Sequence, residues 1–224
     1  MSYQAKVLEF ARELKKQPYH SPSLSFGGNA KLVTDSIAYF SLPAGLSCPG
    51  ADTCNSQSFC YAQNGNYARM NVIKKQLNNY FASQKESFVY LMVDRISNLS
   101  GKVKFIRIHD SGDFYSKAYV AKWVEIIEEC SMFDVRFYAY TKSYAALDLS
   151  HLWNLGNINL IQSEGSKDDS AIDYNKPHAR IFPTLEDLKA AGYEDASKSD
   201  FPAALGETRI GLVIHGAGKA RWQG

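Results

Sequence analysis

Hydrophobic and polar positions alternate in six short segments of the chain, separated mostly by stretches with a helical repeat. The predicted strands, rich in β-branched and aromatic residues, span residues 35–45, 103–110, 135–141, 158–164, 179–184 and 209–216. Apolar residues at intervals of three and four predict helices at 116–130, 143–156 and 185–193, with two more helical stretches within 66–101. Residues 1–24 form an N-terminal helix and a lead-in.

Strands separated by helices of this length predict right-handed crossovers and a parallel sheet. We therefore expect one α/β domain over residues 1–224, with a largely parallel six-stranded sheet. An open doubly wound sheet and a partial (β/α)6 barrel both fit this pattern, and we expect the partial barrel. In either fold the chemistry collects where the strands end, at the carboxyl edge of the sheet.

The composition indicates an ordinary globular protein. Of 224 residues, 45% are hydrophobic and 21% charged, and no apolar run approaches the roughly 18 to 20 residues of a membrane span. The first residues lack the pattern of a secretory signal, so we expect a cytoplasmic protein with no membrane partner. A net charge of +2 with scattered basic residues neither requires nor excludes a nucleic-acid partner. Neither a substrate nor an oligomeric state can be predicted from the sequence.

Three of the four cysteines lie in a single loop, predicted at 46–66, directly after the first strand. Cys48, Cys54 and Cys60 follow one another at intervals of six, and grouped cysteines in a reducing compartment more often bind metal than form disulfides. Three thiolates can hold a [4Fe–4S] cluster with one open iron, or a structural zinc ion with a fourth ligand. The spacing favours neither. Cys130 ends a predicted helix, and we expect it to be a buried apolar residue.

Polar residues also follow the second and third predicted strands. His109, Asp110 and Asp113 lie within five residues, so they could bind a metal ion or act as acid and base in a metal-dependent hydrolase. The alternative is a loop that caps the next helix. Lys142, in the segment TKS, is a candidate for contacting a phosphate or carboxylate, or a surface lysine beside a helix cap.

Three segments resemble the phage gene product 88 family: SLPAGLSCPGADTC, IRIHDSGDFYSKAYVAKW and FYAYTKS. This resemblance extends over roughly residues 25–216. The order of strand, three-cysteine loop ending in Cys60-Tyr61, helix, strand and acidic loop more distantly resembles the radical S-adenosylmethionine enzymes, whose core is a six-stranded partial barrel.

The second resemblance implies a cofactor site. Cys48, Cys54 and Cys60 would ligate a [4Fe–4S] cluster whose open iron binds S-adenosylmethionine; Tyr61 would lie near the adenine, and Asp113 would meet the amino group of the cofactor. The remaining residues expected around the cofactor are Ser111, Gly112 and Thr141, and those expected in catalysis are His109, Asp110, Asp113 and Lys142. The alternative is a zinc-stabilised accessory protein that acts on a host protein or nucleic acid. A phage-encoded protein of either kind would work in the host cytoplasm.

Overall fold

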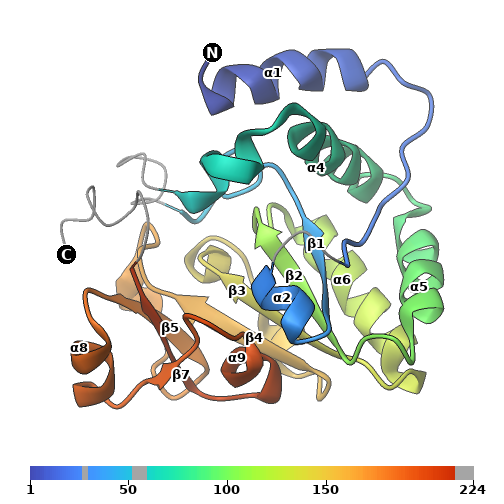
Figure 1. The fold of residues 1–224 in the computed structure, drawn as a ribbon. Helices are drawn as coiled ribbons and strands as arrows, with labels where there is room; N and C mark the ends of the chain where they lie inside the picture. Colours follow the sequence, from blue (N-terminus) through green and yellow to red (C-terminus); the bar gives the residue numbers. More distant parts are fainter. Residues whose placement is uncertain (27–29, 52–59, 215–224) are drawn as a thin grey trace.

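The computed structural model describes residues 1–26, 30–51 and 60–214 (Figure 1). Its described part contains a seven-stranded sheet, ordered β1-β2-β3-β4-β5-β7-β6, in which every neighbouring pair of strands is parallel. The strands are β1 (Ile37–Ser41), β2 (Phe105–Ser111), β3 (Arg136–Thr141), β4 (Ile158–Ser163), β5 (His178–Phe182), β6 (Glu194–Asp195) and β7 (Arg209–Val213).

The predicted α/β class and parallel sheet are confirmed, and the predicted six strands correspond to β1 to β5 and β7. The strand that the prediction missed is β6, which has two residues and is therefore too short to show alternation. From β1 to β5, strands that follow one another along the chain are neighbours in the sheet. The strand order therefore does not reverse, as it would in a doubly wound sheet.

The two faces of the sheet are covered differently. Helices α5 (Phe88–Leu99), α6 (Lys117–Glu129) and α7 (Ser150–Trp153) contribute to the larger apolar core on one face, here called the outer face. The short helices α2 (Ala30–Thr34) and α9 (Phe201–Leu205) lie on the opposite, inner face. The outer core contains the buried rings of Phe40, Phe88 and Trp123, whereas the inner core is built around Leu32, Tyr138 and Ile161.

The prediction of one helix over 143–156 is wrong. A 3-10 turn, η4 (Ser143–Ala145), is followed by a separate helix, α7. The Asp148 carboxylate accepts a hydrogen bond from the Ser150 amide at 2.9 Å, which favours a new helix start in the middle of the predicted one. Helix α8 (Leu185–Ala190) confirms the last predicted helix in shortened form.

Helices α1 (Tyr3–Leu14) and α4 (Met70–Ser83) pack against each other beyond the carboxyl edge of the sheet (Figure 1). Their shared core includes Val7 and Leu77, and two polar contacts join the pair to the end of β1. The Asn79 side chain donates to the Ser41 carbonyl at 3.0 Å, and the Tyr3 hydroxyl accepts from the Ala44 amide at 3.1 Å. None of the described helices has the length and apolarity that crossing a membrane requires.

Four further 3-10 turns complete the described elements. Two of them come before α4: η1 (Tyr61–Gln63) lies within the predicted cysteine loop, and η2 (Gly65–Ala68) overlaps its end. The other two are η3 (Cys130–Met132) and η5 (Asp169–Ala171).

Candidate functional site

The start of the cysteine loop is fixed to the ends of neighbouring strands by backbone hydrogen bonds. The Leu42 amide donates to the Ser111 carbonyl at 2.8 Å, and the Asp113 amide donates to the Ser47 carbonyl at 3.0 Å. Further along, the Lys167 amide donates to the Gly50 carbonyl at 2.9 Å. Residues 42–51 therefore lie along the carboxyl edge of the sheet, where chemistry was predicted to collect.

Two glycines allow this close approach. A β-carbon on Gly50 would lie 2.0 Å from the Lys142 carbonyl oxygen, and one on Gly112 would lie 2.5 Å from the β-carbon of Leu42. Gly112 also has a φ of +85°, a conformation that favours glycine. Gly112 was predicted to bind a cofactor, and the structure gives it a packing role at the base of the loop.

Two of the three predicted thiol ligands, Cys48 and Cys60, belong to the described residues, and both influence the pKa of Tyr3 on α1. Burial raises the pKa of Tyr3, the Ala44 amide lowers it, and negative charge on Cys60 and on Cys48 raises it further. Both cysteine side chains are half-buried, and Cys60 also packs against the α1–α4 core. Cys48 therefore lies in the segment that runs along the carboxyl edge of the sheet, and Cys60 lies against the helices beyond that edge. Cys54, the third predicted ligand, lies outside the described residues.

Cys130 differs from these two thiols. It is fully buried in the outer core, as predicted, and burial raises the pKa of its thiol to about 12.

Asp113 is buried between the ends of β2 and β3 and accepts three hydrogen bonds. One carboxylate oxygen accepts from the Phe114 amide and the Thr141 hydroxyl, both at 2.7 Å, and the other accepts from the Lys142 amide at 2.8 Å. Burial raises the pKa of Asp113 to about 6, although these donors lower it. Thr141 and Ser111, also predicted to bind cofactor, are engaged in loop packing, since the Ser111 hydroxyl donates to the Leu42 carbonyl at 2.9 Å.

Lys142 is held against the end of β4. Its ammonium group donates to the Ser163 hydroxyl at 2.9 Å and to the carbonyl oxygens of Ser163 and Glu164. These contacts give the side chain a role in joining the ends of β3 and β4. Its catalytic role remains a prediction.

A β-bulge near the end of β2 changes the face of the sheet on which the side chains of His109 and Asp110 lie. Phe40 pairs with Ile108 but the next residue, Ser41, pairs with Ser111, and His109 has a φ of +67°. His109 consequently enters the outer core, on the same side as Ile108, and Asp110 enters the inner face.

The surroundings of His109 are those of a core residue. Its ring packs against Phe114 and Tyr119 and is 2% exposed, and its Nε2 lies 2.8 Å from the Tyr119 hydroxyl. Burial, with a smaller effect of Arg107, lowers the pKa of His109 to about 3. The imidazole is therefore neutral near pH 7. Its pKa lies well below the operating pH, whereas a general base works best when the two are close.

Asp110 is surrounded by hydroxyl groups at the inner face. The Ser41 hydroxyl donates to one carboxylate oxygen at 2.5 Å, and the Tyr67 hydroxyl donates to the other at 2.9 Å. The Tyr61 hydroxyl donates to the Asp110 carbonyl. Burial raises the pKa of Asp110, while Arg107 and the two hydroxyl donors oppose that rise.

An ion-pair cluster below Asp110 was not predicted from the sequence. Asp200, at the start of α9, lies 2.9 Å from Arg107 of β2 and 2.5 Å from Lys31 of α2, and it accepts a hydrogen bond from the Tyr138 hydroxyl at 2.6 Å. Burial would raise the pKa of Asp200, but the two cations hold it below its usual value. The Arg107 guanidinium also lies 5.1 Å from the ring centre of Tyr140.

Two tyrosines of β3 adjoin this cluster. Tyr138 is fully buried in the inner core, whereas Tyr140 is half-buried and packs against that core beside Arg107. The sequence did offer one signal for Arg107, since it is the one charged residue among the apolar residues of 105–108 and a charge within a buried strand requires a partner. Its partner Asp200 lies 93 residues further along, where no local pattern connects the two.

Among residues 1–26, 30–51 and 60–214, no three His, Cys, Asp or Glu side chains come together as a metal-binding group. His109, Asp110 and Asp113 point into three different environments. The arrangement thus gives no support to a hydrolase metal site made by this trio.

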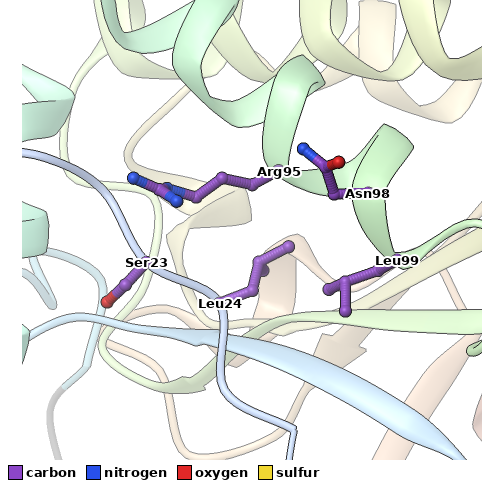
Figure 2. Close-up of a pocket in the computed structure, with 5 residues that line it drawn as sticks. All are labelled: Ser23, Leu24, Arg95, Asn98 and Leu99. Atoms are coloured by element: carbon purple, nitrogen blue, oxygen red, sulfur yellow. The ribbon is translucent and has the colours of Figure 1, made fainter.

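A surface pocket lies away from these residues, between the lead-in segment and α5 (Figure 2). Ser23, Leu24, Arg95, Asn98 and Leu99 line it. The guanidinium of Arg95 binds the Ser21 hydroxyl at 2.7 Å and the Pro22 carbonyl, so it holds the lead-in segment in place.

Comparisons with known proteins identify phage relatives. The gene 88 protein of Mycobacterium phage D29 is 34% identical over 146 residues, which are 60% of this chain and 58% of that protein. The gene 88 protein of Mycobacterium phage L5 is 33% identical over 195 residues, 80% of this chain and 75% of that protein. The chain thus spans less than two thirds of the D29 protein.

No solved structure matches the chain. The comparisons also provide no support for the resemblance to radical S-adenosylmethionine enzymes. The family model described as gene product 88 matches residues 13–221. This chain therefore belongs to the gene product 88 family of phage proteins.

Proposed function

We propose that the protein is a metal-binding phage enzyme in which Cys48, Cys54 and Cys60 hold a [4Fe–4S] cluster and S-adenosylmethionine binds beside it. The observation that supports this proposal is the place of the cysteine loop, since residues 42–51, which include Cys48, are hydrogen-bonded along the carboxyl edge of the sheet and Cys60 packs against the α1–α4 core beyond it. Thiolates are the ligands that both iron–sulfur clusters and zinc prefer, so the two described thiols fit either group. The position after β1 favours a reactive site over a remote structural clasp.

A cluster with one open iron, together with S-adenosylmethionine, supplies radical chemistry that removes a hydrogen atom from a substrate. The residues of this chain bind and position what takes part. Asp113 and Lys142 hold the ends of β2, β3 and β4 in register beneath the cysteine loop, and both act as positioning residues. Tyr61 directly follows the last cysteine and extends from the loop to the inner face.

Tyr3 has a further part in this proposal. Its hydroxyl accepts from the Ala44 amide and donates to the Gln76 side chain at 3.3 Å, which fixes it just before the start of the cysteine loop. Cys60 packs against the α1–α4 core, so these helices limit the access of water to that thiol. Since the relatives are phage proteins, the proposed place of action is the cytoplasm of the infected host.

The test is the binding of S-adenosylmethionine to protein purified without oxygen. We expect the cofactor to change the ultraviolet–visible spectrum of the wild type and of the buried-thiol control Cys130→Ala, and to leave that of Cys48→Ala unchanged. If the wild type contains iron but its spectrum does not change when S-adenosylmethionine is added, the enzyme proposal is refuted. A colourless protein with one zinc ion would favour the accessory protein instead.

A further inference from the structure

The positive charge of the molecule is concentrated on one pair of helices. Eight of the 25 basic residues but only two of the 23 acidic residues lie on α1, α4 and the two positions on either side of each helix, so the rest of the chain has a net charge of −4. The basic helix pair, as we name this set, consists of Lys6, Arg12, Lys15, Lys16, Arg69, Lys74, Lys75 and Lys85, with Glu9 and Glu13 as its acidic members. All eight basic residues except Lys6 are exposed.

This charge lies next to the candidate site. The helix pair packs beyond the carboxyl edge of the sheet (Figure 1), and Asn79 and Tyr3 bind it to the end of β1. The Lys75 ammonium reaches the Ser25 hydroxyl at 2.5 Å, and Ser25 pairs with Tyr39 of β1. A polyanion bound along the helix pair would therefore pass close to the carboxyl end of β1.

Two tyrosine rings lie in the turns that lead into α4. Tyr61 is 57% exposed although its hydroxyl binds the Asp110 carbonyl, so part of its ring surface faces solvent. The ring of Tyr67 packs edge-on against that of Tyr61, with centres 5.5 Å apart. An exposed tyrosine face next to a basic surface is the combination with which proteins bind single-stranded nucleic acid, since the rings stack on bases and the cations bind phosphates.

Deeper in the inner face, the Tyr140 hydroxyl and Arg107 Nε are buried without a hydrogen-bond partner in the described structure. They lie on neighbouring strands, and the Arg107 guanidinium is 5.1 Å from the ring centre of Tyr140. Buried donors of this kind are costly unless a partner reaches them, and the edge of a nucleobase carries acceptors for both.

We propose that the substrate is a base of single-stranded nucleic acid, whose backbone lies on the basic helix pair and whose base stacks on Tyr61 at the inner face. The chemical step rests on the proposed function, whereas the binding of nucleic acid does not. An experiment can therefore refute the enzyme without refuting nucleic-acid binding, and the reverse. Loss of iron with retained binding would refute the enzyme, and a loaded cluster without binding would refute this substrate.

The test is fluorescence anisotropy of the full chain with labelled single strands of DNA and RNA of about 12 nucleotides. Measurements at about 50 and 200 mM salt give the salt slope, which we expect to decrease by about 0.7 for each phosphate contact removed. The double variant Lys15→Glu/Lys74→Glu reports on the helix pair. Its matched control is Lys102→Glu/Lys104→Glu, the same change at exposed lysines just before β2, at the opposite edge of the sheet.

We expect Tyr61→Ala to weaken binding by roughly tenfold, the usual effect of losing one base-stacking ring. Tyr61→Phe keeps the ring and should bind like the wild type. Tyr90→Ala, at a tyrosine on α5 that is 74% exposed, is the control for a lost surface ring. The proposal is wrong if no strand binds at low salt, if Tyr61→Ala binds normally, or if the control double variant loses as much affinity. Equal affinity for a polyglutamate peptide would also overturn it, because charge alone would then explain the binding.

Discussion

At the scale of single residues, two buried titratable groups flank one strand end and respond to pH in opposite directions. The pKa of Asp113 is raised to about 6 and that of His109 is lowered to about 3. Folded protein therefore binds more protons than unfolded protein at Asp113 between about pH 4 and 6, and fewer at His109 between about pH 3 and 6.5. As pH rises, the Asp113 contribution to stability decreases and the His109 contribution increases, so the wild-type profile is flattened where the two windows overlap.

Variants separate these contributions. As pH rises from 4 to 6, we expect the unfolding free energy of Asp113→Asn to increase by about 2 to 3 kcal/mol more than that of the wild type, because the opposing carboxyl is gone. The unfolding free energy of His109→Gln should decrease over the same rise in pH. Urea denaturation at several pH values measures both. Profiles that run parallel to the wild type would show that neither group titrates as described.

The same strand end shows what sequence could not predict at this scale. Regular alternation would put His109 on the same face as Arg107, and it is the bulge that sends Asp110 there instead. Adjacent histidine and aspartate residues at a strand end are typical of a catalytic site. Nothing in their local sequence reveals a φ of +67° or the aromatic surroundings that make His109 a core residue.

At the scale of elements, the cysteine loop depends on its contact with the turn after β3. A β-carbon at Gly50 would lie 2.0 Å from the carbonyl oxygen of Lys142, which is backbone and cannot rotate away. We expect Gly50→Ala to destabilise the protein by about 1 to 3 kcal/mol, the usual cost of overpacking, and to weaken metal binding because the loop must shift.

Gly156→Ala is the matched control, since a β-carbon there would meet no atom within 4 Å. It should change the free energy of unfolding by less than about 0.5 kcal/mol. Equal stability and equal metal content in both variants would contradict the close packing of the loop on the strand ends. Thermal melts and metal analysis of the two proteins provide the comparison.

Most elements of the sheet could be predicted because each main strand buries a run of β-branched or aromatic residues. Segment 103–110 is an example, and it corresponds closely to β2. The failures share a physical cause. The two residues of β6, the five-residue helices α2 and α9, and the break before α7 are too short for periodicity and depend on tertiary contacts.

At the scale of the molecule, the winding of the sheet explains how distant residues come to share one site. Because β1 to β5 are neighbours in chain order, their carboxyl ends form one continuous edge. Cys48 follows β1, Asp113 follows β2 and Lys142 follows β3, so residues almost 100 positions apart lie along this edge. The sequence predicted this collection, but the buried Arg107–Asp200 pair required the fold, since α9 brings Asp200 back across the inner face.

The distribution of charge also depends on the whole fold. The net charge of +2 did not indicate a partner, but the packing of α1 on α4 brings together basic residues that are scattered in the sequence. Membership of the gene product 88 family identifies relatives among phage proteins but does not identify a reaction. The central claim is therefore the chemical one, that the thiols of the cysteine loop hold a metal at the carboxyl edge.

The measurement that tests this claim most directly is the iron, zinc and acid-labile sulfide content of protein purified without oxygen, for the wild type, Cys60→Ala and Cys130→Ala. We predict about four irons and four sulfides per chain in the wild type and in Cys130→Ala, as a four-iron cluster requires, and loss of both in Cys60→Ala. A wild type without bound metal, or a Cys60→Ala protein that retains the full metal content, would contradict the account.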